Sequence, residues 1–213
     1  MQASLFQTTN AKVHYMEHQL GNGKITEFPN AFDVKESAYL LDRLLKLIPW
    51  KQEFLKIAGR AVKVPRLQCW MGDRASHYGY SGIRLAPLPW QEDVLFIRNR
   101  IETLCEIEFN SVLLNYYRNG KDSVAWHADD ENELGRNPII ASASFGAERQ
   151  FQLRHKHKRI SPNKKFEMTL ENGSLIVMGE GLQENWLHQI PKIKELEEAR
   201  INLTFRNIIT PTI

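Results

Sequence analysis

Cysteine is nearly absent from this chain of 213 residues, which contains only Cys69 and Cys105. Two cysteines are too few for a disulfide framework, so we expect reduced thiols in a cytoplasmic protein, or a nuclear one if the source is eukaryotic. Long apolar runs are missing too, since no stretch approaches the roughly 18 to 20 residues that span a bilayer. The segment from Met1 to Phe6 lacks a basic start and an apolar run, so we expect neither a secretory signal nor a membrane segment.

A large excess of one charge is also lacking. The net charge is +3 and the pI is about 8.8, which permits a nucleic-acid partner without demanding one. No repeat, low-complexity tract or linker divides the chain, and its hydrophobic content of 42% is ample for one core. We therefore predict a single domain over residues 1–213, and nothing in the sequence demands more than a monomer.

Two helices are predicted in the first half of the chain. Asp33 followed by Glu36 is typical of an N-cap with a capping box, and leucines then repeat at helical spacing until Pro49 ends the pattern. A second helix is expected to begin near Trp90. Its apolar stripe consists of Val94, Ile97, Ile101 and Leu104.

From Phe109 onward the pattern changes to short runs typical of β-strands. The predicted strands are Ser111–Tyr117, Ser123–Ala128, Ile139–Ser144, Gln150–Arg154, Lys165–Leu170, Ser174–Met178, Trp186–Gln189 and Ile201–Arg206. Asn119-Gly120 predicts a hairpin that pairs the first two, and Asn172-Gly173 marks another turn. Short strands behind a helical section predict an α+β fold, a double-sheet jelly roll braced by helices.

Three residues have the types and spacing of a metal site. His127 and Asp129 are two positions apart, and His188 follows downstream. Alternate residues of a strand point to one face, so the first two can reach a single ion. Two imidazoles and one carboxylate leave three positions of an octahedral ion open, which suits non-haem Fe(II) and O2. A lone H-x-D is common by chance, so this interpretation depends on the complete set.

Arg200 and Arg206 are separated by an even number of positions. If this stretch is a strand, both guanidiniums face one side and can bind the carboxylates of a small dicarboxylate. Asn115 and Tyr117 also share a strand face, and the predicted hairpin would place them beside the H-x-D pair. An amide and a phenol are suitable hydrogen-bond partners for the same dicarboxylate.

Five segments together resemble the AlkB family of Fe(II)/2-oxoglutarate dioxygenases, in particular the branch that repairs alkylated bases. They are Asn115-Tyr-Tyr117, His127-Ala-Asp129-Asp-Glu131, Pro138-Ile-Ile-Ala-Ser-Ala-Ser-Phe-Gly146, Trp186-Leu-His188 and Arg200-Ile-Asn-Leu-Thr-Phe-Arg206. The resemblance covers about residues 60–207. It implies a double-stranded β-helix, the same jelly roll, as catalytic core in residues 109–213. Residues 1–108 would then supply helices and a substrate-recognition region.

The resemblance also implies roles for individual residues. The Fe(II) ligands would be His127, Asp129 and His188. The residues binding 2-oxoglutarate would be Asn115, Tyr117, Arg200, Asn202, Thr204 and Arg206. With O2, the reaction gives succinate and CO2 and hydroxylates an N-methyl group of a base such as 1-methyladenine or 3-methylcytosine, and this carbon leaves as formaldehyde.

Candidates for contact with the alkylated nucleic acid are Tyr78, Tyr80, Asp130, Glu131 and Arg154. The tyrosines are suited to stacking on a cationic base, and the acidic residues can accept hydrogen bonds from it. Arg154 opens a basic run that reaches Arg159 and suits phosphate groups. The alternatives are ordinary packing for the tyrosines, a solvated acidic loop and a solvated basic turn.

The stretch before Val64-Pro-Arg66 lacks the aromatic residue that the duplex-repairing type inserts into the base stack. We therefore predict a preference for single-stranded DNA or RNA. Two other functions stay open. A 2-oxoglutarate oxygenase acting on proteins or small molecules would leave the basic run without a role, and a non-catalytic nucleic-acid-binding jelly roll would not need an intact ligand set.

Overall fold

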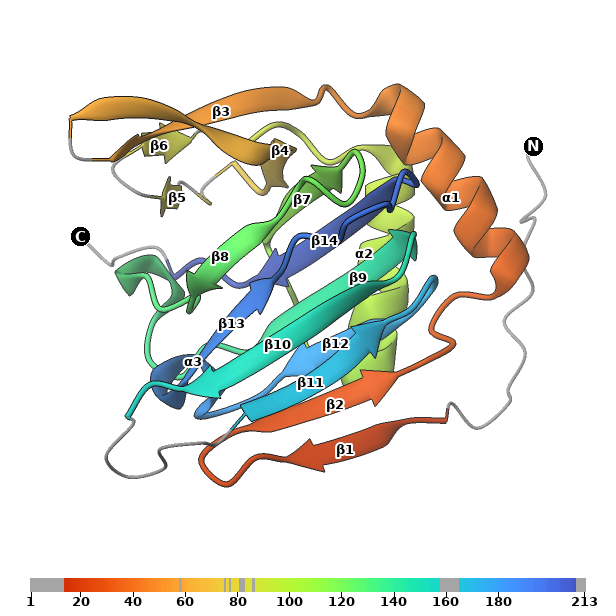
Figure 1. The fold of residues 1–213 in the computed structure, drawn as a ribbon. Helices are drawn as coiled ribbons and strands as arrows, with labels where there is room; N and C mark the ends of the chain where they lie inside the picture. The colour runs from red at the N-terminus through yellow and green to blue at the C-terminus, as the bar shows by residue number, and fades with distance from the viewer. Residues whose placement is uncertain are drawn as a thin grey trace.

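The computed structural model describes residues 14–57, 59–74, 76, 78–80, 83–85, 87–157 and 165–209. These residues form two antiparallel sheets that face each other, with two long helices packed against the larger sheet (Figure 1). This arrangement agrees with the predicted jelly roll braced by helices. No helix in the described part of the chain combines the length and the apolar character that crossing a bilayer requires.

The larger sheet has eight strands and the smaller sheet has four. In spatial order, the larger contains β1 (Met16–Gln19), β2 (Lys24–Phe28), β12 (Leu175–Met178), β9 (Ile140–Gly146), β14 (Arg200–Arg206), β7 (Ser111–Tyr117), β4 (Arg60–Gly72) and β3 (Lys51–Ile57). The smaller contains β11 (Lys165–Leu170), β10 (Arg149–His155), β13 (Trp186–Ile190) and β8 (Val124–His127). The short strands β5 (Tyr78–Tyr80) and β6 (Ile83–Leu85) pair separately.

Both predicted helices are present. Helix α1 (Val34–Leu47) begins with the predicted capping box, in which Asp33 Oδ1 accepts from Glu36 N at 2.8 Å and the Glu36 carboxylate accepts from Asp33 N at 3.1 Å. It ends before Pro49, because the residue preceding a proline avoids the helical region. Helix α2 (Glu92–Cys105) begins two residues after Trp90, where the Gln91 side chain accepts from the backbone of Val94.

Two apolar layers hold these elements together. One lies between the helices and the larger sheet, and the other fills the space between the sheets. Strand β14 is buried along its whole length, because one face packs in the helix-side layer and the other lies between the two sheets. Ile201, Leu203 and Phe205 belong to the helix side, so the alternating polar residues of β14 point to the space between the sheets.

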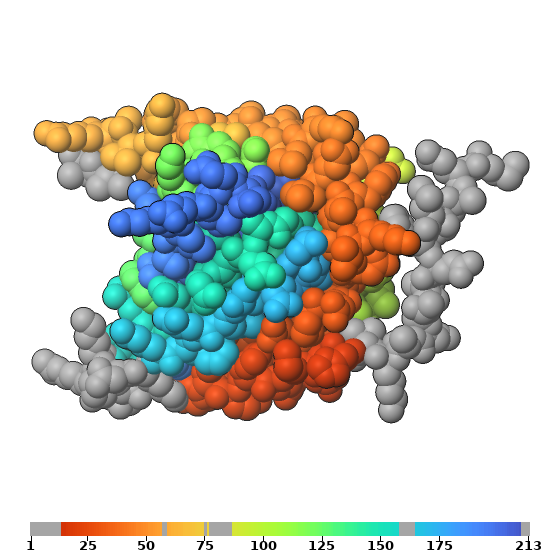
Figure 2. Space-filling model, turned by 45° about the vertical axis from the view of Figure 1, so that its right-hand side comes forward, coloured from red at the N-terminus to blue at the C-terminus, as the bar shows by residue number. Residues whose placement is uncertain are grey.

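All the strands predicted after Phe109 are present, with ends shifted by at most two residues. The strands β1 to β6, by contrast, lie in a region for which only helices are predicted. Strands β1 and β3 are the two edges of the larger sheet, and β1 is largely exposed. A polar edge strand lacks the alternation of apolar and polar residues by which a strand is recognised in a sequence. In the space-filling view, β3 and β4 form the upper edge of the molecule, and their far end projects beyond its body (Figure 2).

The predicted hairpin between β7 and β8 is wrong. Strand β7 pairs with β14 and β4 in the larger sheet, whereas β8 pairs with β13 in the smaller one. The turn at Asn119-Gly120 exists, but Gly120 exchanges backbone hydrogen bonds with Leu196 and Ile193 of the β13–β14 connection. A Cβ at Gly120 would lie 2.1 Å from the Ile193 carbonyl oxygen. The contact between Gly120 and the β13–β14 connection therefore fixes the path by which the chain crosses from the larger sheet to the smaller one.

Candidate active site

A cavity between the two sheets collects every residue predicted to bind metal or 2-oxoglutarate. Its lining includes Asn115, Tyr117, His127, Asp129, His188, Arg200, Asn202, Thr204 and Arg206. The arrangement differs from the predicted one, in which Asn115, Tyr117 and the H-x-D pair share one sheet face. The residues of β7 and β14 instead lie in the larger sheet and face the histidines of the smaller sheet across the cavity.

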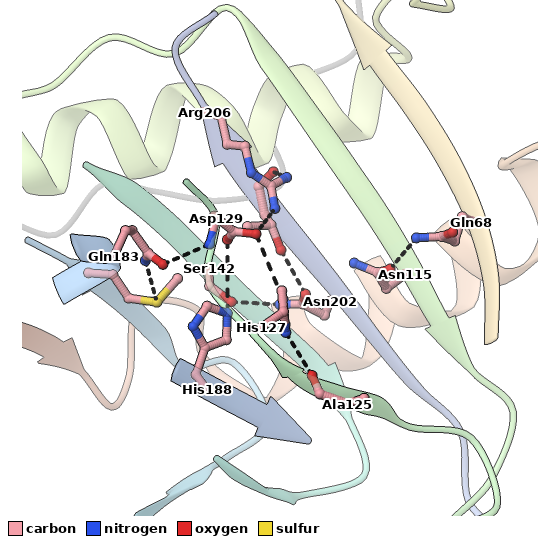
Figure 3. Close-up of polar contacts among 12 residues, drawn as sticks. Gln68, Asn115, Ala125, His127, Asp129, Ser142, Gln183, His188, Asn202 and Arg206 are labelled. Carbon is pink, nitrogen blue, oxygen red and sulfur yellow. Dashed lines mark hydrogen bonds and ion pairs between the residues drawn. The ribbon is translucent and has the colours of Figure 1, made fainter. Parts of the chain in front are cut away.

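His127, Asp129 and His188 form a group that can hold a metal ion, with ligand atoms all within 4.8 Å of one another. The β8–β13 ladder places His127 directly opposite His188, and their ring centroids are 4.2 Å apart. Asp129 follows the end of β8 and approaches both rings, with its carboxylate oxygens 3.7 Å from His127 Nε2 and 4.0 Å from His188 Nε2 (Figure 3).

The electrostatics of this group suit a divalent cation. Burial alone would raise the pKa of the Asp129 carboxyl, but Arg206 and the two histidines hold it well below its usual value, so the carboxylate is ionised. Burial, together with the neighbouring His127, lowers the pKa of His188 to about 3, so its ring is neutral near pH 7. The Ala125 carbonyl lies 2.8 Å from His127 Nδ1 and can only accept, so Nδ1 donates to it and Nε2 is the ring nitrogen that faces Asp129.

Arg206 contacts the metal group directly. Its Nη2 lies 3.0 Å from Asp129 Oδ1, and both side chains are 4% exposed. The guanidinium predicted to bind a 2-oxoglutarate carboxylate therefore also holds a proposed metal ligand. A planar guanidinium has five N–H donors, so one group can serve both purposes.

Arg200 marks the other end of the cavity and is 1% exposed. Its Nη2 donates to Ser144 Oγ at 2.9 Å, while Nε and Nη1 have no hydrogen-bond partner among the described residues. The guanidinium carbons of Arg200 and Arg149 lie 5.1 and 5.3 Å from the centre of the Tyr117 ring. Burial lowers the pKa of Arg200 to about 10, and the groups that modulate it include no carboxylate. A buried cation with unused donors that lines the cavity fits an anionic ligand at this end.

Asn115, between the two ends, is oriented by residues that the sequence does not reveal. Its Oδ1 accepts from Arg66 Nε at 2.7 Å. It also accepts from Gln68 Nε2 at 2.9 Å (Figure 3). The oxygen must face these donors, so the amide nitrogen is left to donate elsewhere. Asn202 and Thr204 are also predicted to bind 2-oxoglutarate, but some of their polar groups already form hydrogen bonds within the protein. Asn202 Nδ2 donates to Ser142 Oγ, and Asn202 Oδ1 accepts from the Thr204 hydroxyl.

Asp130, Glu131 and Arg154, which are predicted to contact the substrate, are not among the residues that line the cavity. The exposed carboxylate of Asp130 accepts from Lys156 Nζ at 2.8 Å. The Arg154 guanidinium lies over the Trp126 ring at 4.4 Å. Glu131 is half-buried at the start of the 3-10 turn η1 (Asn132–Leu134). The side chains of Tyr78 and Tyr80, and residues 158 and 159 of the basic run, lie outside the described residues.

Known proteins match this chain over most of its length. Residues 24–206 match the model of the 2OG-Fe(II) oxygenase superfamily. The human "Alpha-ketoglutarate-dependent dioxygenase alkB homolog 3" is 40% identical over 197 residues, which cover 88% of this chain and 67% of that protein. The "DNA oxidative demethylase ALKBH2" of Arabidopsis thaliana is 34% identical over 215 residues, with coverages of 89% and 68%. Human ALKBH2 is 38% identical over 159 residues, with coverages of 73% and 61%.

A solved structure, described as "The structure of OsALKBH1", shares the fold with a TM-score of 0.63. It is 15% identical and covers 91% of this chain and 100% of its own. At that identity the likeness concerns the fold alone, and it confirms the jelly roll with helices predicted from the sequence. The superfamily match and the relatives that are 34–40% identical over the matched residues establish the wider relationship. The chain belongs to the AlkB family of 2-oxoglutarate- and Fe(II)-dependent oxygenases.

Proposed function

We propose that this protein oxidatively demethylates N-alkylated bases of the 1-methyladenine and 3-methylcytosine type in nucleic acid. It would use Fe(II), O2 and 2-oxoglutarate and release succinate, CO2 and formaldehyde. The main support is one cavity that holds a His-Asp-His group beside two buried arginines. Relatives named as DNA oxidative demethylases support nucleic acid, and DNA in particular, as the target, and we propose DNA repair as the role. We further propose that it acts as a monomer in the cytoplasm, or in the nucleus of a eukaryote.

Each group in the cavity has a role in this proposal. His127 and His188 would bind iron through neutral ring nitrogens, and Asp129 would supply the negative charge. When bound, the iron supplies the oxygen chemistry that oxidises both 2-oxoglutarate and the methyl group. Arg206 would orient Asp129 and meet the nearer carboxylate of 2-oxoglutarate, while Arg200 would bind the distant one.

The remaining predicted cosubstrate residues would complete this end of the cavity. Asn115 would donate from the amide nitrogen that Arg66 and Gln68 leave free. Tyr117 would close the site beside Arg200, and Thr204 and Asn202 would hold the polar floor through their mutual hydrogen bond. Apolar lining residues such as Phe151 and Ile190 would keep water out.

The rim of the cavity would recognise the base. Bases methylated at the Watson–Crick edge are cationic. The Asp130 carboxylate would therefore release Lys156 and accept a hydrogen bond from the base, and Glu131 would accept a second one. Tyr78 or Tyr80 would stack on the base, and Arg154 would meet a phosphate of the strand. A residue that inserts into a duplex would have to stand at the β3–β4 turn. The exposed aromatic residue Phe54, at 45% exposure, lies within β3, three residues before the end of that strand. We therefore keep the preference for single strands as part of the proposal.

The test is repair of oligonucleotides that each carry one 1-methyladenine or 3-methylcytosine, as single strands and as duplexes. With Fe(II), ascorbate and 2-oxoglutarate, we expect formaldehyde and succinate in matching amounts, and faster repair of single strands. His127→Ala should abolish turnover but leave oligonucleotide binding largely intact. Turnover that persists in this variant refutes the metal assignment, and faster duplex repair contradicts the strand preference.

A further inference from the structure

The three proposed metal ligands are held in two different ways. His127 and His188 lie opposite each other in the β8–β13 ladder, so backbone hydrogen bonds fix both positions. Asp129 lies beyond the end of β8, outside both sheets. Its placement therefore depends on side chains that reach it from other elements. Arg206 is one of them and holds the carboxylate.

Gln183 is the second side chain that reaches Asp129. Its Oε1 accepts from the Asp129 backbone N–H at 2.9 Å, and its Nε2 donates to Met178 Sδ at 3.4 Å (Figure 3). A backbone N–H can only donate, so the oxygen of the amide must face Asp129. Gln183 is 2% exposed and Met178 lines the cavity. One buried amide therefore links the backbone of a proposed metal ligand to the cavity wall.

The helix that carries Gln183 is anchored by the opposite end of the chain. Helix α3 (Leu182–Asn185) follows Gly181, which has a φ of +78°, and a Cβ there would lie 3.1 Å from the Asn22 carbonyl oxygen. A Cβ at Gly23 would lie 2.9 Å from Leu182 Cδ1, and Gly179 N donates to the Lys24 carbonyl oxygen at 2.8 Å. The turn between β1 and β2 thus leaves α3 little freedom to shift.

We infer that Gln183 is a positioning residue for Asp129, holding the backbone of this ligand while Arg206 holds its carboxylate. The inference rests on the proposed metal site. Without Gln183, the Asp129 N–H would be buried with no acceptor, and the residue would move to find one. Ligand distances at a metal site tolerate shifts of only about 0.2 Å, so this movement would weaken metal binding.

The experiment is a Co(II) titration of the metal-free protein, followed by the visible absorption of the ion. Gln183→Met keeps the length of the side chain and removes the acceptor, and we expect it to bind Co(II) about 10–100-fold more weakly than the wild type. Gln183→Glu keeps an oxygen acceptor and should bind more tightly than Gln183→Met. Gln189→Met is the matched control, because Gln189 donates to Gln152 Oε1 away from the cavity lining. It should bind Co(II) like the wild type.

A measurement on the wild type keeps the inference testable if Gln183→Met does not fold. In the metal-free protein, the Asp129 amide should be protected from hydrogen exchange, whereas an amide that exchanges like an open loop would overturn the inference. Wild-type affinity in a folded Gln183→Met would also overturn it, yet leave the proposed function standing. A wild type that does not bind Co(II) at all would remove the proposed metal site, and the inference with it.

Discussion

At Arg200, ligand binding and stability are expected to oppose each other. This side chain is 1% exposed, and burial lowers the pKa of its guanidinium to about 10. A buried charge without an ion-pair partner carries a desolvation penalty, so its replacement by an apolar side chain of similar volume is expected to be neutral or stabilising. Removing the partner of a buried ligand carboxylate costs about 2–5 kcal/mol of binding. Arg200→Met should therefore melt at the same temperature or higher, yet bind 2-oxoglutarate at least about 30-fold more weakly.

Thermal melts of the metal-free protein and calorimetric titration with 2-oxoglutarate, in the presence of Mn(II) without oxygen, measure the two effects. Ser144→Ala is the milder comparison, because it removes only the acceptor of Arg200 Nη2. A destabilised Arg200→Met that retains its affinity for 2-oxoglutarate would show that Arg200 supports the fold rather than the ligand.

The residues that could be predicted from the sequence carry chemistry at a recognisable spacing. His127 and Asp129 sit at alternate positions, and the arginines of β14 share its inner face. Gln183 and Gln68 carry no such signal, because a buried amide acquires its role only from the groups that the fold places beside it. Gln68, for instance, reaches Asn115 because the β4–β7 register places the two residues opposite each other.

At the scale of elements, the β7–β8 connection is held by one buried carboxylate. Asp122 is 4% exposed and accepts three hydrogen bonds from Arg118, through N at 2.9 Å and through Nε and Nη2 at 2.7 Å. Its backbone carbonyl also accepts from Arg149 Nη2. Burial raises the pKa of the Asp122 carboxyl, but the hydrogen bonds from Arg118 outweigh burial and hold the pKa below its usual value.

Asp122→Asn should therefore destabilise the protein in a pH-dependent way. A lowered pKa in the folded state contributes stability above the unfolded value of roughly 3.9, and this contribution is lost as the pH falls below it. Since Arg118 is 44% exposed, we expect a loss of about 1–2 kcal/mol in the free energy of unfolding at pH 7. The loss should shrink towards pH 3, as urea denaturation at both pH values would show.

Asp42→Asn is the control for this prediction, because the Asp42–Lys46 pair is exposed and should contribute little. An equal loss at pH 3 and pH 7 would mean that the shape of Asp122, and not its charge, supports the connection.

The elements themselves could be predicted wherever burial leaves a pattern. The strands after Phe109 alternate or are continuously apolar because they face a core, and several of the connections between them contain glycine. The strands β1 and β3 are edges with polar sequences, so they leave no such pattern. Which strands pair is a different question. The Asn119-Gly120 turn is a strong hairpin signal, yet Gly120 packs on a loop some 70 residues away along the chain, and no local pattern contains that contact.

At the scale of the whole molecule, the proposed ligands join the two sheets. His127 and His188 come from the smaller sheet, while Arg200 and Arg206 come from β14 in the larger one. Asp129 lies between them, in contact with Arg206 and near both histidines. A bound metal would engage the histidine side alone, whereas a dicarboxylate chelated to that metal would also engage the arginines. Stability should therefore depend on the two ligands jointly.

We expect Mn(II) and 2-oxoglutarate together to raise the melting temperature by more than the sum of the two rises that each ligand causes alone. A ligand at about 100 times its dissociation constant stabilises the folded state by about 2.7 kcal/mol. For a chain of this size, that corresponds to a rise of about 5–10 °C. EDTA should reverse the rise, and His127→Ala should show none, because 2-oxoglutarate would then lack the ion that holds its other end. Calorimetric melts under the four ligand conditions measure the coupling. Purely additive shifts in melting temperature would mean that the metal and the dicarboxylate bind without contact. That result would contradict the proposal that they bind together in one cavity.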